Sequence, residues 1–243
     1  MSWYAYCIAE QSAFLSGGAR ARRPFPIPGM QGVRGAQVLG YPSGDFAVVV
    51  SEYTPDGTLK QEAVLDHARV VSECFRTGTV LPFRFGTVFN NDEALRRAVR
   101  ANRRALMESV ARLRGKSEMH LKLVVKDASL REVLSDSALP NVVGSEYLSC
   151  LRAKAARQRE RQSKARAISV QVHKLFNPLE EEVSCKTDSD GLLIDIAHLI
   201  DSGAVKKYQS RCTAATRHLK GCEIVVSGPW PPYHFTPNKL RTA

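Results

Sequence analysis

The sequence predicts an α+β protein built from two domains. Its 243 residues exceed the roughly 100–150 residues that a single hydrophobic core usually organises. Hydrophobic residues make up 44% of the chain and charged residues 24%, which is within the ordinary globular range. β-prone runs alternate with amphipathic helical runs, and Gly115-Lys116-Ser117 separates two such sets. We therefore expect one domain at residues 1–115 and a second at residues 116–243.

The first half begins with a strand and a hairpin. Residues 3–9 are aromatic and apolar without strict alternation, as in a central strand buried on both faces. The three prolines within residues 19–32 favour a loop, because proline fixes φ and lacks an amide donor. Residues 33–40 and 46–53 flank a Pro-Ser-Gly-Asp turn, so we expect them to pair as a hairpin.

A helix, a strand and a second helix complete this half, which gives the order β-ββ-α-β-α. Apolar residues recur at three-to-four spacing over residues 64–75, and Gly78 ends that helix. Residues 79–89 predict a strand, with Pro82 at its start or in a bulge. The polar residues 90–93 then cap a helix that runs to about residue 114, since their side chains accept the free amides of a first turn.

The second half predicts the order β-α-β-α-β, which is of the ferredoxin-like α+β type with helices on one sheet face. A long helix from Gly144 to about Phe176 is stopped by Asn177-Pro178, because proline clashes with the preceding turn. The remaining elements are strands at residues 119–125, 192–199 and 222–227 and a helix at residues 204–219.

Charge and targeting signals place constraints on partners and location. The net charge of +11 and the pI near 9.6 favour an anionic partner, which is a nucleic acid, a membrane surface or an acidic protein patch. No run approaches the ~18–20 apolar residues of a membrane span, and the first ten residues lack a signal-peptide pattern. We expect a cytoplasmic protein whose six scattered cysteines are free, buried thiols.

An unusual string, TVLPFRFGTV, covers residues 79–88 and interrupts an apolar strand with three exceptions. The first exception is Pro82. The second, Gly86, permits close approach of another backbone. Arg84, between two phenylalanines that include Phe85, either stacks or pairs with a carboxylate, or is simply solvated on an edge strand. These four residues are candidates for a structural motif or a partner contact.

A second string closes the chain with a preset polyproline or turn geometry. Its candidate residues are Gly228, Pro229, Trp230, Pro231, Pro232 and Tyr233. The segment either docks on a partner or folds back, and we favour folding back, with Trp230 and Tyr233 capping the core of the second domain.

The long helix carries the densest charge in the sequence. Its candidate contact residues are Arg152, Lys154, Arg157, Arg159, Arg161, Lys164 and Arg166. Against them stands only Glu160, so this stretch has a net charge of +6. It is either a basic arm for an acidic partner surface or nucleic acid, or, as the charge pattern alone favours, a solvated face whose aliphatic stems cover the core.

The residues that would support catalysis are missing from the sequence. No phosphate-binding loop, His-Glu-x-x-His motif or nucleophile elbow occurs, and the six histidines are dispersed rather than set at metal-ligand spacing. Three adjacent glutamates at residues 180–182 are better interpreted as a solvated acidic patch in a loop than as an acid and base pair. We therefore expect no enzymatic activity, no cofactor and no metal.

Three strings in order carry a resemblance that covers residues 3–235. They are the segment 61–89, with His67 in its helix and VLPFRFGTVF after it, the GSEYL that includes Tyr147, and GPWPPYHF. Together they resemble the GvpF/GvpL family of gas vesicle accessory proteins. A departure is the strand 192–199, where Asp195 and His198 stand in place of the more uniformly apolar residues of relatives.

The resemblance implies a modified ferredoxin-like N-terminal domain and an α+β C-terminal domain. It further implies a gas-vesicle-associated protein without catalytic residues, which binds the small hydrophobic structural protein and other accessory proteins and assists shell nucleation or assembly. A small-molecule substrate is not implied. The alternative, based on charge, is a basic nucleic-acid-binding protein, which we rank lower because no aromatic residues are interleaved with the arginines of the long helix.

Overall fold

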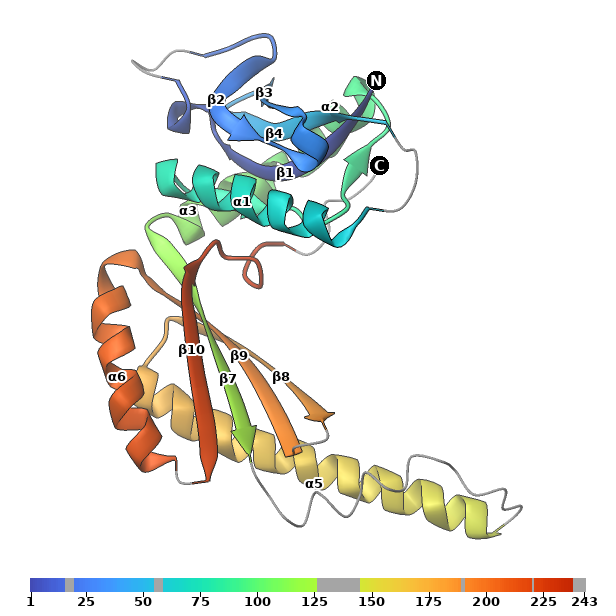
Figure 1. Ribbon diagram of the computed structural model, residues 1–243, viewed down its shortest axis with the longest axis vertical. Helices are drawn as coiled ribbons and strands as arrows, with labels where there is room; N and C mark the ends of the chain where they lie inside the picture. The colour runs from blue at the N-terminus through green and yellow to red at the C-terminus, as the bar shows by residue number, and fades with distance from the viewer. Residues whose placement is uncertain (16–19, 55–58, 126–144, 189–190, 220, 238–243) are drawn as a thin grey trace. The chain divides into compact units, whose positions relative to one another are not determined.

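The computed structural model describes residues 1–15, 20–54, 59–125, 145–188, 191–219 and 221–237. The chain divides into two compact units, one made of Met1–Ser117 with Trp230–Ala243 and the other of Glu118–Pro229 (Figure 1). The predicted α+β class is confirmed, since both units combine a sheet with helices. The tail from Trp230 groups with the first unit, whereas independent folding of domains 1–115 and 116–243 stays a prediction.

The first unit contains a sheet in the order β2-β3-β4-β1-β5, with β6 also paired to β1. Its strands are β1 (Ser2–Glu10), β2 (Phe25–Gln31), β3 (Gln37–Ser43), β4 (Phe46–Tyr53), β5 (Val80–Pro82) and β6 (Val88–Phe89), and its helices are α1 (Gln61–Thr77), α2 (Asp92–Ala101) and α3 (Arg103–Leu113). The central position of β1 and the existence of the β3–β4 hairpin are confirmed, but β3 begins at Gln37 rather than residue 33 and includes Tyr41-Pro42-Ser43, which we expected in the turn.

Strand β1 is buried on both faces because helices cover both sides of the sheet. Tyr4 and Tyr6 pack with Val70 and Val71 of α1 on one face. Trp3 points to the other face, where its indole Nε1 donates to Asp92 at the start of α2 at 2.8 Å. A register shift between Ala5 and Cys7 adds a bulge to β1, and this explains why its sequence does not alternate strictly.

Three first-half predictions are wrong in detail. Half of the expected loop at 19–32 is strand β2, which tolerates its prolines because it is the edge of the sheet. The expected strand at 79–89 is two short strands, β5 and β6, on either side of a turn. The expected helix up to residue 114 is divided at Asn102 into α2 and α3, while the predicted cap is formed by Asn91, whose side chain accepts the Ala94 amide at 2.8 Å.

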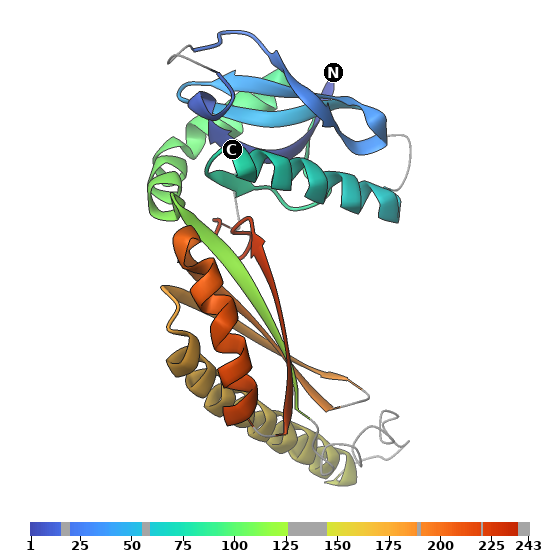
Figure 2. The ribbon, with the colours of Figure 1, turned by 60° about the vertical axis from the view of Figure 1, so that its left-hand side comes forward.

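The second unit contains a four-stranded sheet in the order β10-β7-β9-β8 (Figure 2). Its elements are β7 (Lys116–Val125), α5 (Ser145–Phe176), β8 (Glu180–Asp188), β9 (Gly191–Asp201), α6 (Val205–His218) and β10 (Cys222–Trp230). Short 3-10 helices occur at Gln11–Ala13, Val33–Gly35 and Ser202–Ala204. The order βαββαβ, with β9 between β7 and β8, is the split arrangement of ferredoxin-like folds.

Strand β8 is the element that we missed in this unit. The prediction that Glu180, Glu181 and Glu182 lie in a loop is wrong, because they form the first part of an edge strand that pairs antiparallel with β9. Alternate residues of β7 and β9 pack against α5 and α6 and form one core. Its largest members include Met119, Leu121, Leu123, Phe176, Leu192, Ile194, Ile196 and Tyr208.

Candidate partner-binding surface

The motif at residues 82–87 forms a tight turn between β5 and β6. The Thr87 amide donates to the Arg84 carbonyl oxygen at 3.2 Å, and the Thr87 hydroxyl donates to the same oxygen at 2.7 Å. Gly86 has φ of +82°, which is the value that the third residue of a type II turn requires. Pro82 is buried opposite Cys7 of β1. The proline and the glycine of the motif therefore have structural roles, and Phe85 at the tip stays 38% exposed.

A chain of hydrogen bonds connects this turn to the core. The Gly86 amide donates to the Tyr4 hydroxyl at 3.1 Å, and this hydroxyl lies 3.0 Å from His67 Nδ1. His67 Nε2 lies 3.2 Å from the Phe83 carbonyl oxygen, which can only accept. Nε2 of His67 therefore carries a proton, and in the neutral form, which the lowered pKa of the ring favours, the Tyr4 hydroxyl donates to Nδ1. Both ring nitrogens of this buried histidine therefore have hydrogen-bond partners, which suits a structural role.

Burial shifts both titrating groups of this network toward their neutral forms. Burial lowers the pKa of His67 to about 4, opposed by its bond to the Phe83 carbonyl. Burial likewise raises the pKa of Tyr4 to about 12. The ring of Phe85 meets the rings of Tyr4 and His67 edge-on, with centroids 6.4 Å and 5.9 Å away. The exposed phenylalanine is thus held in a fixed position by buried aromatic groups.

An exposed apolar side chain of α1 lies on the helix face that meets this turn. Val64 is three residues before His67, whose ring contacts Phe85, and is 43% exposed, whereas Leu65, two residues before His67, points away from that face. We call Val64 and Phe85 the turn surface. Large apolar side chains held in place at the surface are typical of a protein-binding site.

The tail motif packs on the first unit, which corrects its expected position. Tyr233 packs against the core cluster of that unit, and Pro231 and Pro232 are buried. Trp230 is 43% exposed and does not cap a core as predicted. Arg112 of α3 donates to the Phe235 carbonyl oxygen at 2.5 Å and so holds the tail in place.

The long helix α5 is only partly covered by the described elements of its unit. Its core-facing stripe begins at Ala165, and the preceding half extends past the strands in Figure 1. Tyr147 and the basic residues Arg152, Lys154, Arg159 and Arg166 are exposed, whereas Arg161 and Lys164 are half-buried. The side chain of Arg157 lies outside the described residues. Arg152, Arg159 and Arg166 recur every seven residues, so they share one face at intervals of about 10 Å.

The sequence did not predict a buried polar cluster in the second unit. His198 Nδ1 lies 2.6 Å from the Tyr208 hydroxyl, and His198 Nε2 lies 2.7 Å from the Glu181 carboxylate. Burial lowers the pKa of His198, opposed by Glu181. The position of His198 in an otherwise apolar strand was the sequence signal that could have indicated this cluster. The sequence did not show its partner, because Glu181 lies opposite His198 only through the pairing of β8 with β9.

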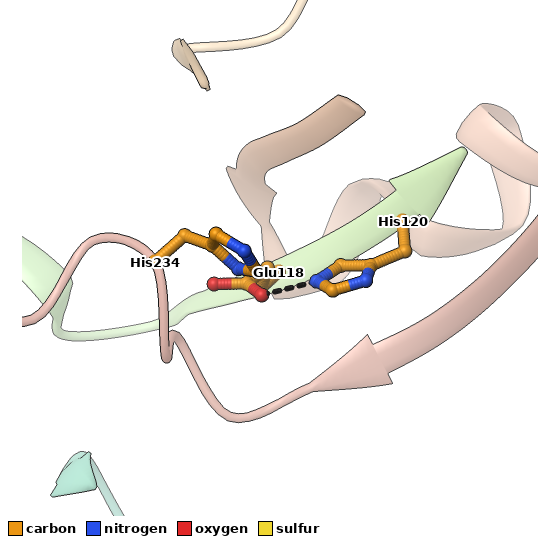
Figure 3. A group of neighbouring side chains, drawn as sticks. All are labelled: Glu118, His120 and His234. Atoms are coloured by element: carbon orange, nitrogen blue, oxygen red, sulfur yellow. Dashed lines mark hydrogen bonds and ion pairs between the residues drawn. The ribbon is translucent and has the colours of Figure 1, made fainter. Parts of the chain in front are cut away.

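A second histidine–carboxylate pair lies on β7. Glu118 is fully buried, and its carboxylate accepts a hydrogen bond from the ring of His120 (Figure 3). The figure also draws His234, which belongs to the other unit. Glu118 and His120 both lie on β7. The hydrogen bond from the His120 ring satisfies the buried Glu118 carboxylate, which suits a structural role. The prediction of no metal and no catalytic residue stays a prediction.

Two chain-wide features bear on location. None of the described helices is long and apolar enough to cross a membrane. All six cysteines are free, and Cys7 and Cys74 are buried as expected, whereas Cys150 on α5 is exposed.

Comparison with known proteins assigns the family. A family model described as gas vesicle synthesis protein GvpL/GvpF matches residues 2–237. This chain belongs to the GvpL/GvpF family. Its membership supports a role in gas vesicle biogenesis, and the predicted resemblance is confirmed.

Individual GvpL/GvpF relatives cover 79–96% of the chain. Gas vesicle protein F2 of Halobacterium salinarum is 25% identical over 236 residues, which cover 96% of this chain and 90% of that protein. Gas vesicle protein F of a Streptomyces species is 27% identical over 212 residues, which cover 79% and 84%.

Solved structures of GvpF share the fold. The crystal structure from Microcystis aeruginosa gives a TM-score of 0.67 at 19% identity, covering 97% of this chain and 99% of that one. The structure from an Anabaena species gives 0.70 at 18% identity, covering 97% and 96%.

Proposed function

We propose that this GvpL/GvpF-family protein assists nucleation or assembly of the gas vesicle shell by binding the small hydrophobic structural protein. The observation that carries the proposal is the turn surface, where Phe85 is exposed yet fixed by Tyr4 and His67. The protein acts in the cytoplasm and at the growing vesicle, as a binding protein without catalysis, cofactor or small-molecule substrate.

The physical logic is complementarity between exposed apolar surfaces. A hydrophobic shell subunit exposes apolar area before it is assembled, and covering such area gains about 25 cal/mol per Å² removed from water. Val64 and Phe85 supply area on the side of this protein. Because the turn is fixed before contact, little conformational entropy is lost on binding.

The exposed arginines of α5 provide a second contact. Arg152, Arg159 and Arg166 form a straight row of positive charge, which suits an acidic surface on the structural protein or on another accessory protein. Such a contact mainly speeds encounter and weakens with added salt, whereas contact through the turn surface does not.

A pull-down with the structural protein tests the proposal. Phe85→Ser combined with Val64→Ser should reduce capture several-fold, because both changes remove exposed apolar area, and unchanged circular dichroism checks that loss of the Phe85 ring contacts leaves the fold intact. Met107→Ser is the matched control, since Met107 is a similarly exposed apolar residue on α3 of the same unit. Equal capture by the double variant and the control, or no capture by the wild type at low salt, would refute this function.

The arginine row also keeps a nucleic-acid-binding function open. Each phosphate that an arginine neutralises adds a salt-dependent increment to binding. Filter binding to duplex and single-stranded nucleic acid across a salt series decides between the two functions. A linear loss of log affinity with log salt, flattened when the three arginines are changed to glutamine, would favour nucleic acid.

A further inference from the structure

One edge of the second sheet lacks the features that prevent strand pairing. Among the described strands, β10 pairs only with β7, so alternate amides and carbonyls of β10 point away from its one partner. Its residues 222–228 read Cys-Glu-Ile-Val-Val-Ser-Gly, with one charge and no proline. Val225 lies on the face opposite the core and is 55% exposed.

The other sheet edges are protected in recognisable ways. Strand β2 carries Pro26 and Pro28, which cannot donate to an added strand. Strands β5 and β6 span only three and two residues. Strand β8 begins with three glutamates, whose charges oppose pairing. Since β10 alone among these edges is long and apolar, it is the edge suited to receive another strand.

The sequence of β10 is complementary to itself in the antiparallel direction. If two copies meet about a two-fold axis at Val225, each Val225 faces the other, and Ile224 faces Val226 of the second copy. Glu223 then faces Ser227, so no like charges are opposed. The half-buried side chains of Ile224 and Val226, which already pack on the core, would become more fully covered. The paired window ends at Gly228, just before Pro229 would interrupt it.

We propose that β10 is a homodimerisation edge, at which a second copy of this chain adds its own β10 antiparallel and centred on Val225. The two four-stranded sheets then form one continuous eight-stranded sheet. This edge belongs to the second unit, whereas the turn surface belongs to the first.

Salt separates this contact from the charged one of the proposed function. Both copies carry a net charge of +11, so their repulsion opposes association and weakens as salt screens it. Self-association should therefore strengthen between low and moderate salt. Binding of the arginine row to an acidic partner should weaken over the same range.

Sedimentation equilibrium of the full chain tests the dimer. The wild-type mass should rise from 26.9 kDa toward twice that value with concentration. Val225→Lys places two like charges face to face and should raise the dissociation constant at least about tenfold. Val170→Lys is the matched control, because Val170 on α5 is 52% exposed and should leave the constant unchanged.

A charge pair at the edge tests the register. Ser227→Lys sets a lysine opposite Glu223 of the second copy and should tighten the dimer, whereas Ser227→Glu opposes two carboxylates and should weaken it. Unchanged circular dichroism shows that each variant is folded. A monomer at every concentration, equal weakening by Val170→Lys, or equal effects of the two Ser227 changes would overturn the proposal.

A different occupant would have its own result. A monomeric chain whose capture of the structural protein is lost in Val225→Lys would overturn the homodimer and assign the edge to that partner. Conversely, the wild type could form a dimer that Val225→Lys weakens and yet not capture the structural protein. This result would support the homodimer through β10 and refute the proposed function.

Discussion

The buried His67 should make the first unit sensitive to mild acid. An unfolded histidine has a pKa near 6.5, whereas burial lowers that of folded His67 to about 4. As pH falls through 6.5 the unfolded chain binds a proton that the folded chain does not bind until about pH 4. The stability contributed by neutral His67 is therefore complete above 6.5 and is lost as pH falls toward 4.

The size of the loss follows from the shift in pKa. At pH 5 nearly every unfolded molecule is protonated at this site and few folded ones are, which costs about 2 kcal/mol relative to pH 7.5. His67→Gln removes the titrating ring but keeps an amide that can donate to the Phe83 carbonyl. This variant should be less stable than the wild type at pH 7.5, yet it should lose about 2 kcal/mol less on acidification.

Urea unfolding followed by tryptophan fluorescence measures this difference. Trp3 is buried in the first unit, and a Trp230→Phe background removes the other tryptophan of the chain, which ends strand β10 of the second sheet. The signal therefore reports the unit that contains His67 and not the one that contains His198. If the wild type and His67→Gln lose the same free energy of unfolding between pH 7.5 and pH 5, the neutral, buried assignment of His67 is incorrect.

Other substitutions test the remaining parts of the structure. Gly86→Ala should destabilise the first unit by about 1 kcal/mol, because φ of +82° is strained for any residue with a Cβ, while Gly203→Ala, where φ is not positive, should have a smaller effect in thermal unfolding. Glu181→Ala should cost about 1–3 kcal/mol by leaving His198 Nε2 without its partner, in contrast with Glu182→Ala on the same strand, and equal losses would argue against the buried cluster. Changing Arg152, Arg159 and Arg166 to glutamine should flatten the salt dependence of partner capture, whereas a change in thermal stability instead would indicate a structural role.

The segments that the sequence predicted correctly are those whose pattern is local. The apolar spacing of α1 and its end at Gly78, the turn chemistry between β3 and β4, and the stop of α5 before Pro178 are each contained within a few turns of chain. The family was likewise predicted from three short sequence motifs, which can be recognised by their order along the chain. Each of these features depends on neighbours that are close along the chain.

The errors occurred where a distant strand decides the outcome. The prolines of β2 are compatible with a strand only because nothing described pairs beyond it, and the glutamates of β8 are compatible with one because that strand is also an edge. The turn at residues 84–87 depends on β1, to which both flanking strands pair. The spacing of apolar residues along one segment gives no information about which distant strand pairs with that segment.

The sequence by itself determined which residues form most elements, which faces are apolar, and the family. Only the tertiary structure placed the Tyr4 hydroxyl against His67 and Glu181 against His198, and grouped the tail with the first unit. The physical reason is that periodicity encodes whether a side chain faces a core, whereas its hydrogen-bond partner depends on strand pairing and register. Those pairings join residues that are far apart in the chain.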